Sequence, residues 1–209
     1  MTEQKALELL RTNPLKLLRK ISLVPSGSSA GNKTFYISKK DQPRVQLKQA
    51  PKYLNQSLLN AEEFRITTNP GFGGVAFDAY SLPMIMKRIN NVDDLRTEMN
   101  QLPAVGPDIV ITGGLSGCSI VTQGNTFAAH IQPYDAKDGL AEKQSGNQLR
   151  YVINTFNGFK VFGRQDYGGT NANIIGVRSG GNWRFYAQGK QLRDTARQEI
   201  VNVREILAV

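Results

Sequence analysis

The stretch of residues 108–133 constrains the fold more than any other part of the chain, because it is rich in β-forming residues on both sides of a turn cluster. Residues 119–122 (SIVT) and 126–129 (TFAA) flank residues 123–125 (QGN), whose types are common in tight turns. A further β-rich run, residues 109–111 (IVI), precedes them. The pattern predicts a β-hairpin, and therefore antiparallel pairing, near the middle of the chain.

The hairpin carries the only cysteine of the chain, Cys118, and the only histidine, His130. A three-residue turn at 123–125 places these two residues directly opposite each other, with Cβ atoms about 4.5 to 5.5 Å apart, so that the thiol and the imidazole touch. A two-residue turn at 124–125 instead pairs Cys118 with Ile131 and sends His130 to the other face. A five-residue loop restores the first register. The sequence is compatible with all three turns.

Short strands also dominate the rest of the chain. We expect strands at 160–163 and in the hairpin pairs 34–38 with 44–48, 63–68 with 75–82, and 174–178 with 183–188. We expect helices at 3–11, 14–21, 53–61, 92–101, 146–156 and 191–204. The strands do not alternate regularly with crossover helices, which disfavours a doubly wound parallel sheet. The pattern predicts an α+β fold with central mixed or antiparallel β-sheets and flanking helices.

The first 31 residues form a predicted helical arm. An apolar stripe that includes Leu10 and Leu17 runs along it, and Pro14 divides it into two helices. Residues 25–31 (PSGSSAG) are the most linker-like segment of the chain. We therefore divide the chain into a basic arm at residues 1–31 and a single catalytic domain at residues 32–209. The sequence does not decide whether the arm is part of that domain.

The positive charge lies mainly in the N-terminal quarter. The net charge is +9, and residues 1–52 hold eleven of the 26 Lys and Arg residues but only three of the 17 Asp and Glu residues. One interpretation is an arm that binds an acidic protein, a nucleic acid or an anionic membrane surface. The simpler interpretation is a solvated basic face that keeps the protein soluble.

Length and composition exclude several classes of protein. The 209 residues suffice for one sizeable core, and no apolar run approaches the ~20 residues that a membrane-spanning helix needs. Lys16, Arg19 and Lys20 interrupt the N-terminal apolar stretch, unlike a secretory signal peptide. A lone cysteine excludes an internal disulfide, and one Cys with one His is too few ligands for a structural zinc ion. We expect a monomer without metal or cofactor.

Cys118 and His130 are the residue types of a nucleophile and its base. A thiol with a pKa of about 8.5 is mostly protonated at neutral pH, and a neighbouring imidazole that takes the proton creates the attacking thiolate. Such a pair needs a third group that orients the imidazole, and the hydroxyl of Thr112 is the candidate because it follows the run 109–111. Main-chain amides near Gly117 are available for an oxyanion. The simpler interpretation is an inert buried cysteine and a structural histidine.

Residues 112–118 (TGGLSGC), with His130 twelve residues after Cys118, resemble the active site of the bacterial glutamine deamidase toxins. The resemblance is to the Burkholderia lethal factor group and to the catalytic domain of the cytotoxic necrotizing factors. It implies that Cys118 is the nucleophile, that His130 activates it, and that Thr112 contacts His130. It also implies a sandwich-like arrangement of the sheets. The chemoreceptor glutamine deamidases of bacterial chemotaxis use similar groups but resemble this chain less.

The resemblance implies an enzyme that converts a glutamine of a host protein to glutamate. Targets of this kind include a translation-initiation RNA helicase and Rho-family GTPases, and the sequence does not choose between them. The expected setting is a toxin or injected effector that leaves a bacterium and acts in the host cytoplasm. The alternatives are a chemoreceptor-type deamidase, a transglutaminase that uses the same site, and a basic module that binds protein or nucleic acid without catalysis.

Overall fold

The computed structural model describes residues 1–41, 45–47, 61–87, 89, 91–132, 158–192 and 198–208. The described part of the chain contains helices α1 (Glu3–Thr12), α2 (Pro14–Leu18) and α3 (Val92–Glu98), and the short 3-10 helices η1 (Pro70–Phe72) and η2 (Arg164–Asp166). Its strands are β1 (Ile21–Pro25), β2 (Gly31–Lys39), β3 (Val45–Leu47), β4 (Glu62–Thr67), β5 (Val75–Ser81), β6 (Met84–Ile85), β7 (Asn100–Gln101), β8 (Ile109–Ile111), β9 (Ser119–Gln123), β10 (Phe127–Ile131), β11 (Phe159–Phe162), β12 (Asn171–Ser179), β13 (Asn182–Leu192) and β14 (Gln198–Ala208).

The strands form two mixed β-sheets. The larger sheet has the order β1-β4-β2-β5-β8-β12-β13-β14-β3, and the smaller has the order β11-β9-β10-β6, with β7 also pairing with β10. Parallel pairs, such as β1 with β4 and β5 with β8, occur beside antiparallel pairs such as β12 with β13. Together with the few helices, this confirms the predicted α+β class with mixed sheets.

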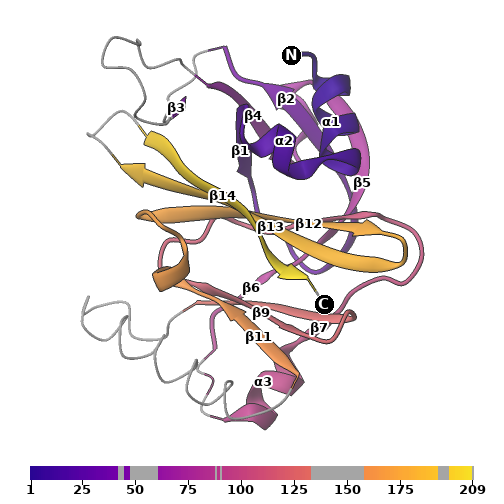
Figure 1. Ribbon diagram of the computed structural model, residues 1–209. Coiled ribbons are helices and arrows are strands. Elements are labelled where there is room, and N and C mark those ends of the chain that lie inside the picture. The colour runs from indigo at the N-terminus through magenta and orange to yellow at the C-terminus, as the bar shows by residue number, and fades with distance from the viewer. Residues whose placement is uncertain are drawn as a thin grey trace.

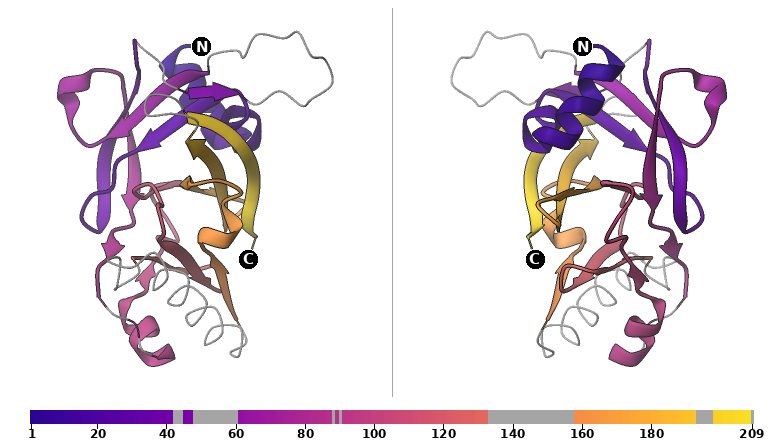
Figure 2. Two further views of the ribbon diagram at one scale, coloured as in Figure 1. Left: turned by 90° about the vertical axis from the view of Figure 1, so that its left-hand side faces the viewer. Right: turned by 90° about the vertical axis from the view of Figure 1, so that its right-hand side faces the viewer.

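Three apolar cores separate four layers. Alternate residues of a strand point to opposite faces, so in β8 Ile109 and Ile111 enter the core beneath α1 and α2, whereas Val110 enters the core between the two sheets. In β9, Ile120 joins the core between the sheets and Val121 joins a third core under α3. Figures 1 and 2 show the resulting order, with α1 and α2 at one end of the molecule and α3 at the other.

The N-terminal residues belong to the same folded body as the strands that follow them. The side chains of Thr2 and Asn13 cap α1 and α2, and Pro14 occupies the first turn of α2 as predicted. Along the apolar stripe of both helices, Leu10 and Leu17 are completely buried in the first core and Leu9 packs partly buried against it. Residues 1–31 are therefore not a separate arm, which answers the question that the sequence left open.

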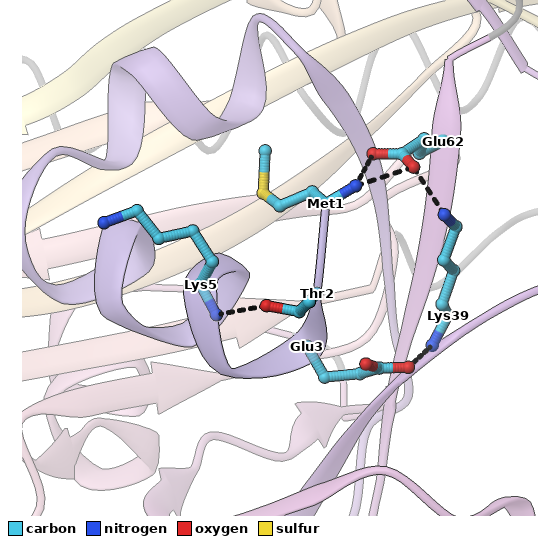
Figure 3. A network of polar contacts seen from close by, with 6 residues as sticks. All are labelled: Met1, Thr2, Glu3, Lys5, Lys39 and Glu62. Carbon is cyan, nitrogen blue, oxygen red and sulfur yellow. Dashed lines mark hydrogen bonds and ion pairs between the residues drawn. The ribbon is translucent and has the colours of Figure 1, made fainter.

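Polar contacts also fix the N-terminus, as Figure 3 shows. The amino group of Met1 donates to both carboxylate oxygens of Glu62 on β4 at 2.8 Å, and Lys39 of β2 pairs with the same carboxylate. The hydrogen bond from Lys39 and that from the amino group hold the pKa of Glu62 below its usual range. Lys39 also donates its main-chain N–H to Glu3, so α1 is bound to the large sheet through charged groups as well as apolar ones.

The edge strand β1 is bound by side chains from β13, although five strands separate the two in the order of the sheet. Gln188 donates to the carbonyls of Leu18 and Ile21 at 2.7 and 2.6 Å and accepts from the N–H of Leu23 at 3.1 Å. Lys190 donates to Ser22 Oγ at 2.7 Å and to the carbonyl of Leu23. The large sheet therefore curls around the first core until its edge meets its own face.

Candidate active site

Thr112 lies directly after the central strand β8. All three residues of β8 are buried, and the carbonyl of Ile111 accepts from the N–H of Leu82 at 2.9 Å, which fixes the end of the strand. Thr112 itself is buried, at 1% exposure. Because β8 sits between β5 and β12 in the large sheet, Thr112 follows a strand that is paired on both sides, at the middle of that sheet.

His130 lies on β10, in the smaller sheet, and meets Thr112 across the interior. Thr112 Oγ1 and His130 Nδ1 are 2.7 Å apart, a short hydrogen bond between buried groups. The contact predicted between these two residues is therefore present. In the tautomer whose proton is on Nδ1, the imidazole donates to Thr112 and leaves Nε2 as a lone-pair acceptor.

The imidazole of His130 is held neutral. Its side chain is buried at 1% exposure, and burial lowers the pKa of His130 from 6.5 to about 4, because the charged form loses its hydration. Nε2 is also buried and has no hydrogen-bond partner within the described part of the chain. A buried nitrogen without a partner is costly, and such atoms often occur where a ligand or a reacting group binds.

Cys118 is presented by a loop that is fixed on both sides. Leu115 pairs with Ala172 of β12 through two main-chain hydrogen bonds of 2.7 and 2.9 Å. Gly117 has φ +132°, a conformation that favours glycine. The backbone therefore explains why a glycine precedes Cys118 in residues 115–118 (LSGC). The phenolic O–H of Tyr167 donates to the carbonyl of Cys118. The nucleophile candidate is therefore set at the start of β9, with 6% of its surface exposed.

The hairpin forms as predicted, but in a register that the sequence did not indicate. The turn consists of Gly124, Asn125 and Thr126, and His130 is paired with Ile120, not with Cys118. The turn lies one residue further along than predicted because Asn125 bonds to Asn182 and to the N–H of Trp183 in the next hairpin of the fold. These partners are distant in sequence, so the local pattern contained no sign of them.

The corrected register keeps Cys118 and His130 on one face. The pairing moves by two residues relative to the three-residue turn at 123–125, and side chains alternate with a period of two, so the shared face is preserved. The two residues are diagonal neighbours, a relation that typically separates residues by about 7 to 8 Å. The expected direct contact is wrong, since Nε2 has no partner among the described residues.

A methionine occupies the space next to the thiol. Met84 Sδ is 3.9 Å from Cys118 Sγ, and Met84 is paired with His130 in the parallel β6–β10 ladder. Met84 is 44% exposed, so it forms the outer wall of the site. Methionine side chains are flexible, so we expect a rotamer change of Met84 to expose the thiol.

The structure thus brings together all three predicted site residues and adds two that the sequence did not reveal. Thr112 and His130 are in contact, and Cys118 lies on the same face, next to Met84. Met84 and Tyr167 were missed because they come from residues far from the motif. Met84 lies 34 residues before Cys118, and Tyr167 lies 49 residues after it.

The charged residues of the N-terminal quarter are partly used within the fold. Lys5, Arg11, Lys39 and Lys40 pair with carboxylates of this chain. An acidic partner for this region stays a prediction. None of the helices in the described ranges is long and apolar enough to span a membrane, and no cluster of three metal-binding side chains occurs among the residues that the structure describes.

Two comparisons with known proteins found no match. No family model matches the sequence, and no curated protein matches it. The functional argument therefore depends on the residues and geometry of the site itself.

Proposed function

We propose that the protein is a cysteine hydrolase that deamidates a glutamine side chain of another protein, with Cys118 as nucleophile, His130 as acid and base, and Thr112 as the orienting residue. One observation carries the proposal. A neutral imidazole is fixed through Nδ1 by Thr112, while its buried Nε2 has no partner in the described chain and lies on the same sheet face as the lone thiol.

The proposed reaction has two steps. His130 Nε2 takes the proton of the Cys118 thiol, and the thiolate attacks the carboxamide carbon, so that a C–S bond forms and the C–N bond breaks. The imidazolium gives its proton to the departing ammonia. Water, deprotonated by the same nitrogen, then cleaves the thioester and leaves glutamate. Main-chain amides around Gly117 and Cys118 are the proposed donors to the oxyanion.

The low pKa of His130 fits a base that rests in the neutral form. At pH 7 an imidazole with a pKa near 4 is deprotonated, so the lone pair of Nε2 is available to the thiol proton. A threonine hydroxyl, in contrast to a carboxylate, orients the ring without adding a negative charge that would favour the imidazolium. A glutamine carboxamide is also neutral and can enter this buried site at little electrostatic cost.

The biological setting follows from the motif resemblance. We propose a toxin or effector whose substrate is a protein of a host cell, in the host cytoplasm, with a translation-initiation RNA helicase or a Rho-family GTPase as the classes to try first. The same thioester can be resolved by an amine in place of water, which would make the enzyme a transglutaminase.

Ammonia release tests the proposal. The native protein and the Cys118→Ser variant are incubated with candidate host proteins, and ammonia is measured with and without an added primary amine. We expect release by the native protein alone, and a product mass about one dalton above the substrate. An amine adduct would indicate transglutamination. Equal ammonia release by both proteins would contradict a role for Cys118.

A further inference from the structure

A second buried acceptor lies beside the imidazole. Gln132 is the residue after β10, and its N–H donates to the carbonyl of Ile85 at 3.0 Å. This bond continues the parallel ladder in which His130 pairs with Met84 and Ile131 with Ile85. The extended backbone therefore includes Gln132. Because Gln132 follows His130 by two residues, the two side chains lie on the same face of the strand.

The register also places Gln132 opposite the nucleophile. Ser119 pairs with Ile131 at the end of the β9–β10 ladder, and one further step sets Gln132 against Cys118. The side-chain oxygen Oε1 of Gln132 is buried, and the described residues supply no hydrogen-bond partner for it. Leaving a buried acceptor unpaired is costly, so a bound ligand that donates a hydrogen bond to it gains affinity.

Two atoms without partners thus lie on one strand face next to one thiol. In the proposed reaction, Nε2 of His130 accepts the proton of the thiol. The main-chain amides donate hydrogen bonds to the carbonyl oxygen of the substrate. The remaining polar group of a carboxamide is its NH2, which has two donor hydrogens and needs an acceptor. Oε1 of Gln132 is the neutral acceptor at this position.

We propose that Gln132 is a specificity-determining residue whose side-chain oxygen accepts a hydrogen bond from the NH2 of the substrate carboxamide. The inference rests on the proposed function, since it assigns the substrate contact of the same site. The contact selects carboxamides over esters, which have no N–H. It also disfavours the carboxylate product, because two acceptor oxygens then face each other, and this assists product release.

The edge of the small sheet gives access to this position. Met84 pairs with His130, and Met86 comes directly after β6, with 44% and 71% exposure respectively. The methylene groups of a glutamine side chain can pack against these two methionines while its amide reaches Gln132. An apolar wall with one or two convergent polar groups is the usual form of a small-group binding site.

Alkylation of Cys118 tests the inference without knowledge of the target protein. Iodoacetamide and methyl iodoacetate have the same leaving group, but only the first has a carboxamide NH2. For each protein, the alkylation rate of Cys118 by iodoacetamide is divided by its rate with methyl iodoacetate. This ratio is then divided by the same ratio measured for free cysteine. Unfolded protein would react with the ratio of free cysteine, so each variant is first shown by circular dichroism to be as folded as the native protein. Gln132→Met is compared with Gln101→Met, an exposed glutamine on β7 of the same sheet.

We expect the native protein and Gln101→Met to favour iodoacetamide by about 5- to 10-fold, the value of one hydrogen bond, and Gln132→Met to show no preference. An equal ratio in the native protein and in Gln132→Met would overturn the role of Gln132, even where ammonia release depends on Cys118. A preference that Gln132→Met abolishes, without any Cys118-dependent ammonia release, would support the carboxamide contact and contradict the deamidase. A Cys118 that reacts with neither reagent would contradict both.

Discussion

The buried imidazole of His130 predicts a specific loss of stability in mild acid. Burial lowers the pKa of His130 from 6.5 to about 4, so between these values the unfolded chain binds a proton that the folded protein does not. Stability from this group is complete above pH 6.5 and is lost as the pH falls toward 4. When the pH falls from 7 to 5, protonation of the histidine in the unfolded chain lowers the free energy of unfolding by about 2 kcal/mol, as calculated from these two pKa values.

The measurement is chemical denaturation at pH 7 and pH 5 for the native protein and for His130→Gln. The chain has a single histidine, so this substitution removes the entire histidine contribution, while the carboxylates contribute equally to both proteins. We expect the native protein to lose about 2 kcal/mol more than the variant over this range. The single histidine also gives one imidazole resonance by NMR, whose midpoint should lie well below pH 6.5.

Equal pH dependence of the two proteins, or an NMR midpoint at or above pH 6.5, would refute this reasoning. The imidazole would then be hydrated or paired with a charge in solution, in contrast to the buried imidazole of the structure.

Three further predictions concern single side chains. Thr112→Val should lower kcat/KM for ammonia release about 10- to 100-fold, because the imidazole loses its orienting contact, whereas Thr122→Val, at a buried hydroxyl without a described partner, should leave it unchanged. Met84→Ala should raise the alkylation rate of Cys118 about fivefold, since it removes the side chain over the thiol, and an unchanged rate would argue against gating. Gln188→Leu should lower the free energy of unfolding by about 3 kcal/mol in urea, because three main-chain groups lose their partner; a loss below about 1 kcal/mol would contradict the closure of the large sheet.

Local signals predicted the elements whose contacts are local. The helices at the N-terminus follow from their apolar stripe, from Asn13 and from Pro14, and the hairpin of β12 and β13 follows from its glycine turn. The predicted hairpin of 63–68 with 75–82 is wrong, because β2 lies between β4 and β5 and pairs with both. The pairing of 34–38 with 44–48 is wrong for the same kind of reason, since β3 pairs with β14.

Non-local contacts shortened one predicted helix and overrode another. The helix predicted at 14–21 ends at Leu18, and Ile21 begins β1, because β4 pairs with this strand and Gln188 binds its main chain from more than 160 residues away. Residues 198–208 form β14, although the segment 191–204 has a helical pattern, because β13 supplies a long antiparallel partner. The predicted helices at 53–61 and 146–156 lie outside the described residues, apart from Ala61.

The residues of the candidate site were easier to predict from the sequence than the positions of their side chains relative to one another. The residue types of Cys118, His130 and Thr112 could be recognised because their chemistry and spacing are distinctive, and the Thr112–His130 contact is present. The register could not be predicted, because Asn125 binds residues of a distant hairpin. Nor could the sequence show that Met84 touches the thiol or that Gln132 continues β10.

The most direct test of the central claim is mass spectrometry of host-cell lysate proteins after exposure to the native protein and to Cys118→Ser. The account predicts at least one glutamine that becomes glutamate, a gain of about one dalton, with the native protein and not with the variant. An unchanged set of glutamines with the native protein, or the same conversion with both proteins, would contradict a Cys118-dependent glutamine deamidase.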